Sequence, residues 1–185
     1  MPHSDQDSLR DALKRVAVTL KDSGLPFALI GGYAVWARGG PEPDHDVDFL
    51  VASDDAAAAA EHLANAGLQV VQPPEDWLFK VYTDDAMVDI IHRDAGDPAL
   101  REEVQDADQI EVLSVEMPVL SATRILIQRL WAIDEHTCDF SRQLPVARAL
   151  REQVDWGRVR DETTGNDFAV AFLFLLERLN IIDTP

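Results

Sequence analysis

Hydrophobic positions along this chain follow two spacings, one typical of helices and one typical of strands. Residues 8–21 carry apolar side chains at helical spacing, and Gly24 and Pro26 mark the end of that helix. The next apolar run, FALI at 27–30, is short and uninterrupted, as is typical of a buried strand. A second run of this kind, DVDFLVA at 46–52, predicts another strand.

Between and after these two strands, the pattern predicts further helices and strands. GGYAVWARGG at 31–40 is interpreted as a glycine turn leading into a brief helix, and PEPDH as a loop. Ser53 is the predicted N-cap of an alanine-rich helix that ends at Gly67. Further strands are predicted at 68–71, 77–82 and 86–91. The last two form an antiparallel hairpin that turns at Asp84-Asp85.

The last third of the chain has a helical pattern. Residues 97–109 are polar and acidic, and their pattern does not distinguish a helix from an ordered loop, whereas 110–120 returns to extended structure. Ser121 is the predicted cap of the next helix, and Pro145 is placed in the first turn of the helix after it. The final helix is predicted to begin at Phe168.

These elements divide the chain into two parts. Residues 1–118 are expected to form an α+β head, and residues 119–185 a helical C-terminal region packed on it. A length of 185 residues with 46% apolar residues is enough to fill one such core. We therefore expect the two parts to pack as one unit.

Composition narrows the cellular setting. There is no basic N-terminal segment before an apolar run, and no apolar run approaches the roughly 20 residues that cross a bilayer. A single cysteine, Cys138, excludes an intramolecular disulfide and fits a reducing compartment. We therefore expect a cytoplasmic protein without a membrane partner.

Net charge narrows the class of partner. The formal charge is −18, from 34 acidic and 16 basic residues, and such a surface repels polyanions. Double-stranded DNA is therefore not an expected partner, whereas a cationic acceptor or a basic protein is compatible. Arginines nevertheless gather in the last third, at Arg142, Arg148, Arg151, Arg158 and Arg160. This cluster is interpreted as a solvated helix face, with acceptor contact as the alternative.

Three carboxylates provide the candidate chemistry. Asp46 and Asp48 alternate along one predicted strand and so share a face, together with Leu50. Asp89 lies inside the apolar run MVDII on another strand, where an unpaired acid is costly if buried. Carboxylates in this arrangement suit Mg²⁺, or Mn²⁺, which prefers oxygen ligands and retains substrate phosphates in its shell. The third carboxylate is also suited to act as a general base.

Two glycines precede these carboxylates. Gly31 and Gly32 follow the first strand, and without side chains their backbone can come close to a triphosphate. The helix that starts there directs its positive end to the same place. Arg38, at the end of that helix, is a candidate to neutralise charge on a pyrophosphate leaving group. Glycines and carboxylates together predict a site for a nucleoside triphosphate.

Here the chain resembles the nucleotidyltransferase superfamily of DNA polymerase β, in its minimal bacterial form. The family pattern matches Ile30-Gly31-Gly32, then Asp46-Val47-Asp48-Phe49, then Val88-Asp89-Ile90. The resemblance implies a mixed β-sheet flanked by helices, three metal-binding catalytic aspartates, and transfer of a nucleotide from an NTP. It also implies a basic residue on the helix after residue 121 that contacts the triphosphate, with Arg129 or Arg124 as the match.

The chain departs from the family at Tyr33, where a small hydroxyl residue often follows the glycines. We assign Tyr33 to the nucleotide site, and its bulk motivates an alternative function. That alternative is an inactive nucleotide-binding or protein-interaction module, for example in a toxin–antitoxin system with an antitoxin-like partner. For an active enzyme, the acceptor is a small molecule or tRNA. A Mn²⁺-dependent glycosyltransferase ranks last, because it leaves the glycines and Asp89 unused.

Other residues have plainer interpretations. His45 is expected on the surface, and His92 stands evenly between the pocket and a structural role. The four tryptophans are interpreted as core or tail packing rather than as base-stacking residues, namely Trp36, Trp77, Trp131 and Trp156.

Overall fold

The computed structural model describes residues 5–43, 45–83, 86–94 and 97–184. The helices in these ranges are α1 (Asp5–Ser23), α2 (Gly31–Ala37), the 3-10 helix η1 (Ser53–Asp55), α3 (Ala56–Asn65), α4 (Arg101–Gln105), α5 (Ala122–Trp131), α6 (Phe140–Leu150), α7 (Trp156–Thr163) and α8 (Asp167–Arg178). The strands are β1 (Phe27–Ile30), β2 (Val47–Val51), β3 (Gln69–Val71), β4 (Leu78–Tyr82), β5 (Met87–Ile91), β6 (Arg93–Asp94), β7 (Asp97–Pro98), β8 (Ala107–Val112) and β9 (Val115–Leu120).

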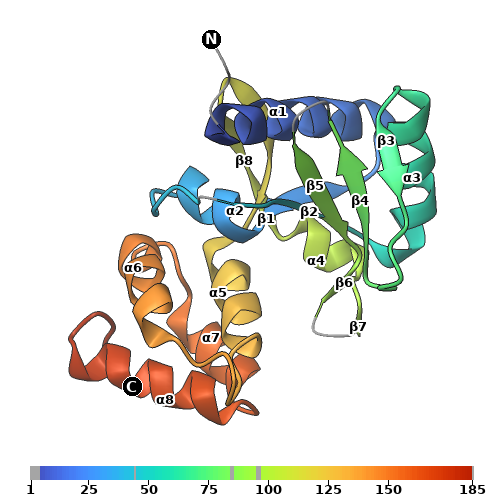
Figure 1. Cartoon of the computed structure of the whole chain (residues 1–185). Coiled ribbons are helices and arrows are strands. Elements are labelled where there is room, and N and C mark those ends of the chain that lie inside the picture. The colour runs from blue at the N-terminus through green and yellow to red at the C-terminus, as the bar shows by residue number, and fades with distance from the viewer. Residues whose placement is uncertain (1–4, 44, 84–85, 95–96, 185) are drawn as a thin grey trace.

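The main sheet has seven strands in the order β3-β4-β5-β2-β1-β9-β8 (Figure 1). Two neighbouring pairs, β2–β5 and β1–β9, run parallel, and the other pairs run antiparallel. The predicted α+β architecture with a mixed sheet is therefore confirmed. The parallel pairing of β2 with β5 matters most, because it joins two strands that are far apart in the sequence.

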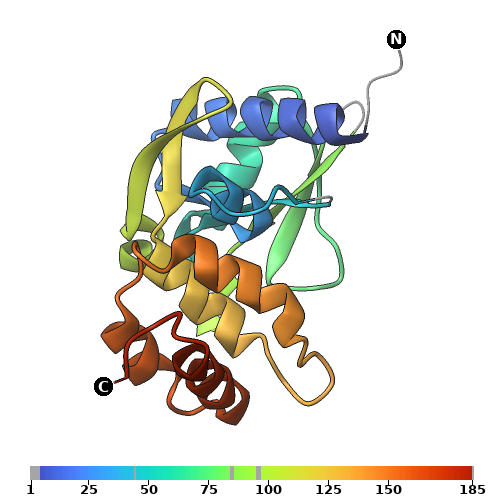
Figure 2. The ribbon, with the colours of Figure 1, turned by 90° about the vertical axis from the view of Figure 1, so that its left-hand side faces the viewer.

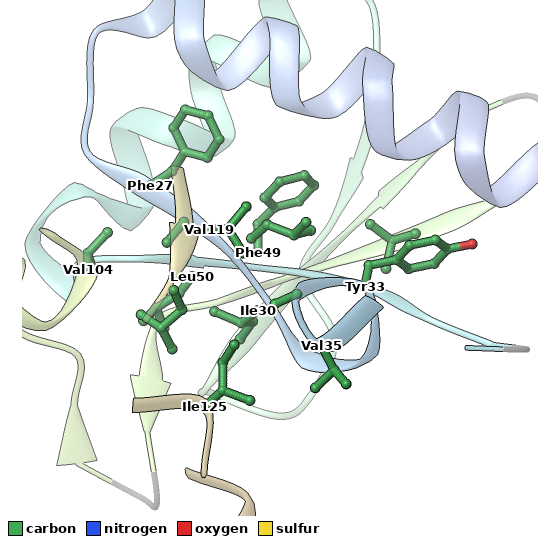
Figure 3. Close-up of a cluster of buried hydrophobic side chains, with 14 of the residues drawn as sticks. Phe27, Ile30, Tyr33, Val35, Phe49, Leu50, Val104, Val119 and Ile125 are labelled. Carbon is green, nitrogen blue, oxygen red and sulfur yellow. The ribbon is translucent and has the colours of Figure 1, made fainter. Parts of the chain in front are cut away.

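Helices cover both faces of this sheet. On one face α1 packs against α3 and against the central strands, and its residues Leu13, Val16 and Leu20 are fully buried (Figure 1). On the other face lie α2 and α4, which contact β1 and β2. Figure 3 shows the two sides of the core, with Phe49 directed towards α1 and Leu50 away from it. The alternation of side chains along β2 explains this division.

The helices α5 to α8 follow the sheet in sequence and form a group of their own (Figure 2). Helix α5 of this group contacts α2, so α5 lies on the same side of the sheet as α2. Ser121 caps α5 as predicted, because its hydroxyl oxygen accepts a hydrogen bond from the Arg124 amide at 3.2 Å. The last strand ends at Leu120, so the proposed boundary at 118/119 falls within β9 and remains a prediction.

Several local predictions differ from the structure. Ser53 does not cap its helix, because its hydroxyl donates to the carbonyl oxygen of His92 instead. Pro145 lies inside α6, which begins at Phe140 behind an Asp139 cap. Residues 110–120 do not form one extended run, because β8 and β9 make a hairpin there.

Two further predictions concern residues 97–109 and the hairpin of β4 and β5. The undecided stretch 97–109 contains β7, α4 and the start of β8. The hairpin of β4 and β5 is present, although the predicted turn at Asp84-Asp85 lies outside the described residues. No helix within the described ranges is long and apolar enough to cross a membrane.

Candidate active site

Two of the three predicted carboxylates stand side by side on the sheet. Asp48 of β2 and Asp89 of β5 are direct partners in the parallel register, and Ile30 of β1 lies opposite Asp48 on its other side. Both aspartates are partly buried, while Val47, Phe49, Val88 and Ile90 beside them are fully buried. The local sequence explains this arrangement, because strand alternation directs the acids to one face and their apolar neighbours to the other.

Asp46 lies just before β2 and has a backbone conformation that differs from that of a strand residue. The strand begins at Val47, so Asp46 precedes it rather than sharing its face as predicted, and Asp46 is exposed. Its φ angle is 51°, in the left-handed region that residues other than glycine seldom adopt. Strained backbone of this kind gathers at functional sites.

The electrostatics of Asp48 show that the three acids act on one another. Burial, followed by the negative charges of Asp89 and Asp46, raises the pKa of Asp48 to about 7, although Lys80 acts in the opposite direction. The carboxylate therefore sits in negative potential that its protein surroundings do not fully neutralise. A cation bound here would relieve that repulsion.

Gly31 closes one side of the carboxylate pair. It has a φ of +65°, and a Cβ atom added to it would fall on Oδ2 of Asp48. Gly32 is also tightly placed, because a Cβ there would lie 2.7 Å from Cβ of Pro43. The glycine pair therefore allows the start of α2 to approach Asp48 and the loop before β2. The predicted approach of these glycines to a triphosphate remains a prediction.

A cavity of about 510 Å³ opens beside Asp48, between the sheet and α5. Its lining residues are Ile30, Gly31, Asp48, Asp76, Trp77, Ile91, Arg93, Ile125, Gln128, Arg129 and Ala132. Figure 3 shows Ile30 and Ile125 facing each other from β1 and α5. The wall is largely apolar with a few charged groups, which is typical of a small-molecule site.

Of the two arginines proposed for the triphosphate, Arg129 lines this cavity and Arg124 does not. Arg124 is bound in ion pairs with Glu103 and Glu162. Arg129 donates from Nε to Oε1 of Gln143 at 2.9 Å, and burial lowers its pKa. Among the residues that the structure describes, no carboxylate forms an ion pair with Arg129. An arginine buried without a counter-charge in a cavity is a candidate for anion binding.

Arg38 is located away from the cavity, contrary to the expectation that it contacts pyrophosphate. Its Nε donates to the Leu120 carbonyl oxygen at 2.7 Å, and its Nη2 contacts the Val119 carbonyl oxygen at 3.0 Å and Asp108 at 2.7 Å. Its side chain is 6% exposed. These contacts engage the guanidinium in fastening α2 to β8 and β9, so Arg38 is not available to a ligand in this structure.

Tyr33 also lies elsewhere, because its side chain is fully buried in the core near α1 (Figure 3). Its ring packs edge-on against Trp36 with centroids 5.8 Å apart, and burial raises the pKa of its phenol. The expected contact of Tyr33 with nucleotide is therefore not supported by its position. For the same reason, its bulk does not block the cavity.

Sequence reasoning missed two residues near the carboxylates. Lys80 lies opposite Asp89 on β4, and its Nζ is 2.9 Å from Oδ1 of Asp89. The signal for this contact was present, because a two-residue turn at Asp84-Asp85 places residues 80 and 89 in register. Trp77 is 42% exposed and lines the cavity, so its interpretation as core packing was wrong.

Of the other tryptophans, Trp36 and Trp156 are partly buried as predicted, whereas Trp131 is 42% exposed. Trp36 is partly buried against Tyr33, and the indoles of Trp131 and Trp156 donate to the backbone carbonyls of Glu162 and Arg151. His45 is exposed as expected. His92 is partly buried, which lowers its pKa, and its carbonyl oxygen accepts from Ser53.

The residues present fit a divalent cation that is shared with a ligand. Within residues 5–43, 45–83, 86–94 and 97–184, no group of three or more His, Cys, Asp or Glu side chains is arranged to hold a metal ion. Mg²⁺, however, is usually held by one or two carboxylates, water and substrate phosphates rather than by a complete protein cage. The carboxylate oxygens suit such a cation, and so do the burial of Asp48 and the negative charges of Asp89 and Asp46, which together raise the pKa of Asp48.

Comparison with solved structures reveals similar folds. The solution structure of the antibiotic-resistance factor ANT(2'')-Ia superimposes with a TM-score of 0.62 at 15% identity, covering 95% of this chain and 99% of that one. Its crystal structure with adenylyl-2''-tobramycin gives 0.60 at 15% identity, covering 90% and 97%. The lincosamide adenylyltransferase LnuA, bound to lincomycin, gives 0.53 at 12% identity, covering 78% and 97%.

Sequence comparison adds nothing to these likenesses, since no family model and no curated protein matches the chain. The structural likenesses extend over most of both chains, at identities that establish the fold alone. The chain thus has the fold of the nucleotidyltransferases, as its resemblance to that superfamily predicted.

Proposed function

We propose that the protein is a nucleotidyltransferase that moves a nucleoside monophosphate from an NTP to an acceptor and releases pyrophosphate. The single observation that carries this proposal is the Asp48–Asp89 pair beside Gly31, at the edge of a cavity lined by Arg129. Nucleotidyl transfer needs groups that bind phosphate, hold a cation and accept a proton, and this arrangement offers a candidate for each. The fold shared with adenylyltransferases supports the same reaction class.

In the proposed mechanism the residues divide the work. Gly31 and Gly32 let the backbone approach the triphosphate, and the guanidinium of Arg129 binds phosphate oxygens. Asp89 accepts the proton of the acceptor hydroxyl as its oxygen attacks the α-phosphorus. A bond forms from the acceptor oxygen to phosphorus, and the bond from phosphorus to the pyrophosphate oxygen breaks.

A divalent cation, Mg²⁺ or Mn²⁺, is part of this proposal. Asp48 and Asp89 would hold it together with water and substrate phosphates, and Asp46 would add negative charge beside them. When bound, the cation would neutralise charge that develops on the phosphate oxygens. The raised pKa of Asp48 supports the assignment, because burial and the nearby charges of Asp89 and Asp46 both disfavour its ionised form unless a counter-ion is bound.

A small cationic molecule is the acceptor that the surface favours over tRNA. The net charge is −18, and arginines of the helical region are already paired, Arg158 with Asp106 and Glu162, and Arg160 with Glu177. They are therefore poorly available for a phosphate backbone. ANT(2'')-Ia and LnuA, whose folds are similar, act on antibiotics of small size.

Pyrophosphate release tests the proposed reaction. Wild-type protein with NTP, Mg²⁺ and acceptor should release pyrophosphate, and Asp48→Asn should reduce turnover on the order of 1,000-fold while folding normally. Equal turnover by the variant would remove Asp48 from the mechanism. Nucleotide binding by the wild type without any pyrophosphate release would favour the inactive binding module instead, with or without an antitoxin-like partner.

A further inference from the structure

Asp48 and Asp89, side by side on β2 and β5, form what we call the carboxylate row. The positively charged Lys80 is in direct contact with this row through Asp89. Cross-strand pairing sets Asp48, Asp89 and Lys80 in line on β2, β5 and β4. The Lys80 ammonium lies 2.9 Å from Oδ1 of Asp89, and the side chains are 26% and 17% exposed. The contact is therefore a partly desolvated ion pair rather than a solvated surface pair, and it engages one oxygen of the proposed proton acceptor.

The position of Lys80 has two physical consequences. Its ammonium is a compact charge that donates up to three hydrogen bonds, so it holds the Asp89 carboxylate in one orientation beside Asp48. The same charge lowers the negative potential that would attract a second cation. Lys80 and a divalent metal therefore compete for Asp89.

We propose that Lys80 is a positioning residue that acts as a built-in cation of the carboxylate row. It orients Asp89 for proton transfer, and it weakens divalent-metal binding to the row before nucleotide arrives. The metal then binds firmly only together with the phosphates of the substrate, which add negative charge. This inference rests on the proposed function and adds a residue that the family resemblance does not supply.

A purely structural cross-strand pair makes a different prediction. Such a pair would stabilise the sheet modestly, and its loss would destabilise the protein without raising its affinity for metal. A built-in cation predicts the opposite effect on metal binding, because removing it leaves the acids uncompensated. Metal affinity without nucleotide therefore separates the two roles.

The test is a titration of the protein with Mn²⁺ alone. The electron paramagnetic resonance signal of free Mn²⁺ gives the concentration of unbound ion at each step. Lys80→Met should bind Mn²⁺ tighter than the wild type, on the order of 10-fold. Lys80→Arg retains the charge and should stay within about twofold of the wild type. Lys14→Met removes the same charge from the exposed ion pair with Asp11 on α1 and should leave the affinity unchanged. Equal or weaker binding by Lys80→Met would overturn the proposal.

Thermal unfolding and kinetics complete the test. In chelator, Lys80→Met should melt below the wild type, and added Mn²⁺ should stabilise it more than it stabilises the wild type. With substrates, kcat of Lys80→Met should fall about 10-fold with little change in KM for nucleotide, because Asp89 is no longer held in place.

Failure of the proposed function would look different from failure of this inference. A protein without transferase activity whose Lys80→Met variant still binds Mn²⁺ more tightly would refute the reaction and retain the role of Lys80 in metal binding. If neither the wild type nor Lys80→Met binds Mn²⁺, the inference is overturned. An active enzyme with unchanged metal affinity in Lys80→Met would also refute it.

Discussion

Asp48 and Asp89 lie directly opposite each other on neighbouring parallel strands, although they are 41 positions apart in the chain. The two acids share one face of the sheet, and the negative charge of Asp89 is one of the causes that raise the pKa of the buried Asp48. The pairing of β2 with β5 thus converts two unremarkable acids into a site where charge must be compensated. The predictions below test the parts of this site separately.

Gly31→Ala is expected to disrupt the site through its new methyl group. The Cβ would fall on Oδ2 of Asp48, so the carboxylate must shift, and turnover should fall on the order of 100-fold. Gly24→Ala is the matched control, because its φ of +70° resembles the +65° of Gly31 and a Cβ there meets nothing within 4 Å.

Both substitutions carry the same backbone penalty of about 1 kcal/mol in the free energy of unfolding. Only Gly31→Ala should also lose activity, measured as initial rates at matched fractions of folded protein. Equal turnover in the two alanine variants would show that the approach of Gly31 to Asp48 has no part in the reaction.

The raised pKa of Asp48 predicts how stability depends on pH in the metal-free protein. Because the folded pKa is about 7 and the ordinary value is 3.8, the folded state retains a proton that the unfolded state releases. The stability linked to this group is therefore fully present below pH 3.8 and is lost as the pH rises to about 7.

The Asn side chain of Asp48→Asn does not ionise, so the variant avoids the stability loss that the ionised Asp48 causes at high pH. In chelator at pH 8 it should be more stable than the wild type by about 2–4 kcal/mol. The difference should shrink as the pH falls towards 4, which denaturant unfolding at each pH measures. Asp54→Asn, at an exposed position, is the control and should show no such trend. A difference for Asp48→Asn that is constant with pH would refute the assigned titration.

Arg129 and Arg38 should respond in opposite ways to alanine substitution. Arg129→Ala removes a cavity guanidinium, so the Kd of nucleotide should rise roughly 10- to 100-fold, the effect of a lost charged hydrogen bond. Arg38→Ala leaves the Leu120 and Val119 carbonyls without their donor and should cost about 1–3 kcal/mol of stability.

Calorimetric binding and thermal unfolding of both variants provide the measurement. The expected pattern is weaker binding with near-normal stability for Arg129→Ala, and normal binding with reduced stability for Arg38→Ala. The reverse pattern would restore Arg38 to the phosphate site and exclude Arg129 from it.

Trp77 should report ligand binding through its fluorescence. It lines the cavity and is 42% exposed, so a bound ligand should change its emission. Trp131 is equally exposed at 42% but does not line the cavity. Trp77→Phe should therefore abolish the emission change on ligand addition, and Trp131→Phe should retain it. Loss of the signal in Trp131→Phe alone would place the ligand elsewhere.

The sequence was sufficient for the parts of the site that depend on local patterns. The strand 27–30 matches β1, and the alternation in DVDFLVA and MVDII correctly predicted strands that carry Asp48 and Asp89. The parallel register that pairs the two residues was not predicted, because parallel neighbours leave no local signal. Asp46 was assigned to the strand because its left-handed backbone is invisible to an alternating pattern.

The remaining differences between the predicted and the observed site arise from the orientation of side chains. Whether Tyr33 and Arg38 face the cavity depends on how the short helix α2 is rotated against the sheet. That rotation is set by the burial of Tyr33 beside Trp36 and by the Arg38 contacts to β9, which are distant in sequence. Likewise, the sequence left both Arg124 and Arg129 as candidates for the triphosphate. The choice between them depends on Glu103 and Glu162, which form ion pairs with Arg124.

Transfer of label from an α-labelled NTP to an acceptor is the decisive measurement of the proposed reaction. The wild type and Asp46→Asn/Asp48→Asn would be incubated with each α-labelled NTP, Mg²⁺ and one acceptor, with tobramycin, lincomycin and bulk tRNA as probes. Separation of small molecules from RNA and protein then follows the label. For the wild type we expect label in a small cationic acceptor, with one pyrophosphate released per transfer, and for the double variant we expect no label. Binding of Mg²⁺-NTP without transfer to any acceptor would contradict the proposed reaction.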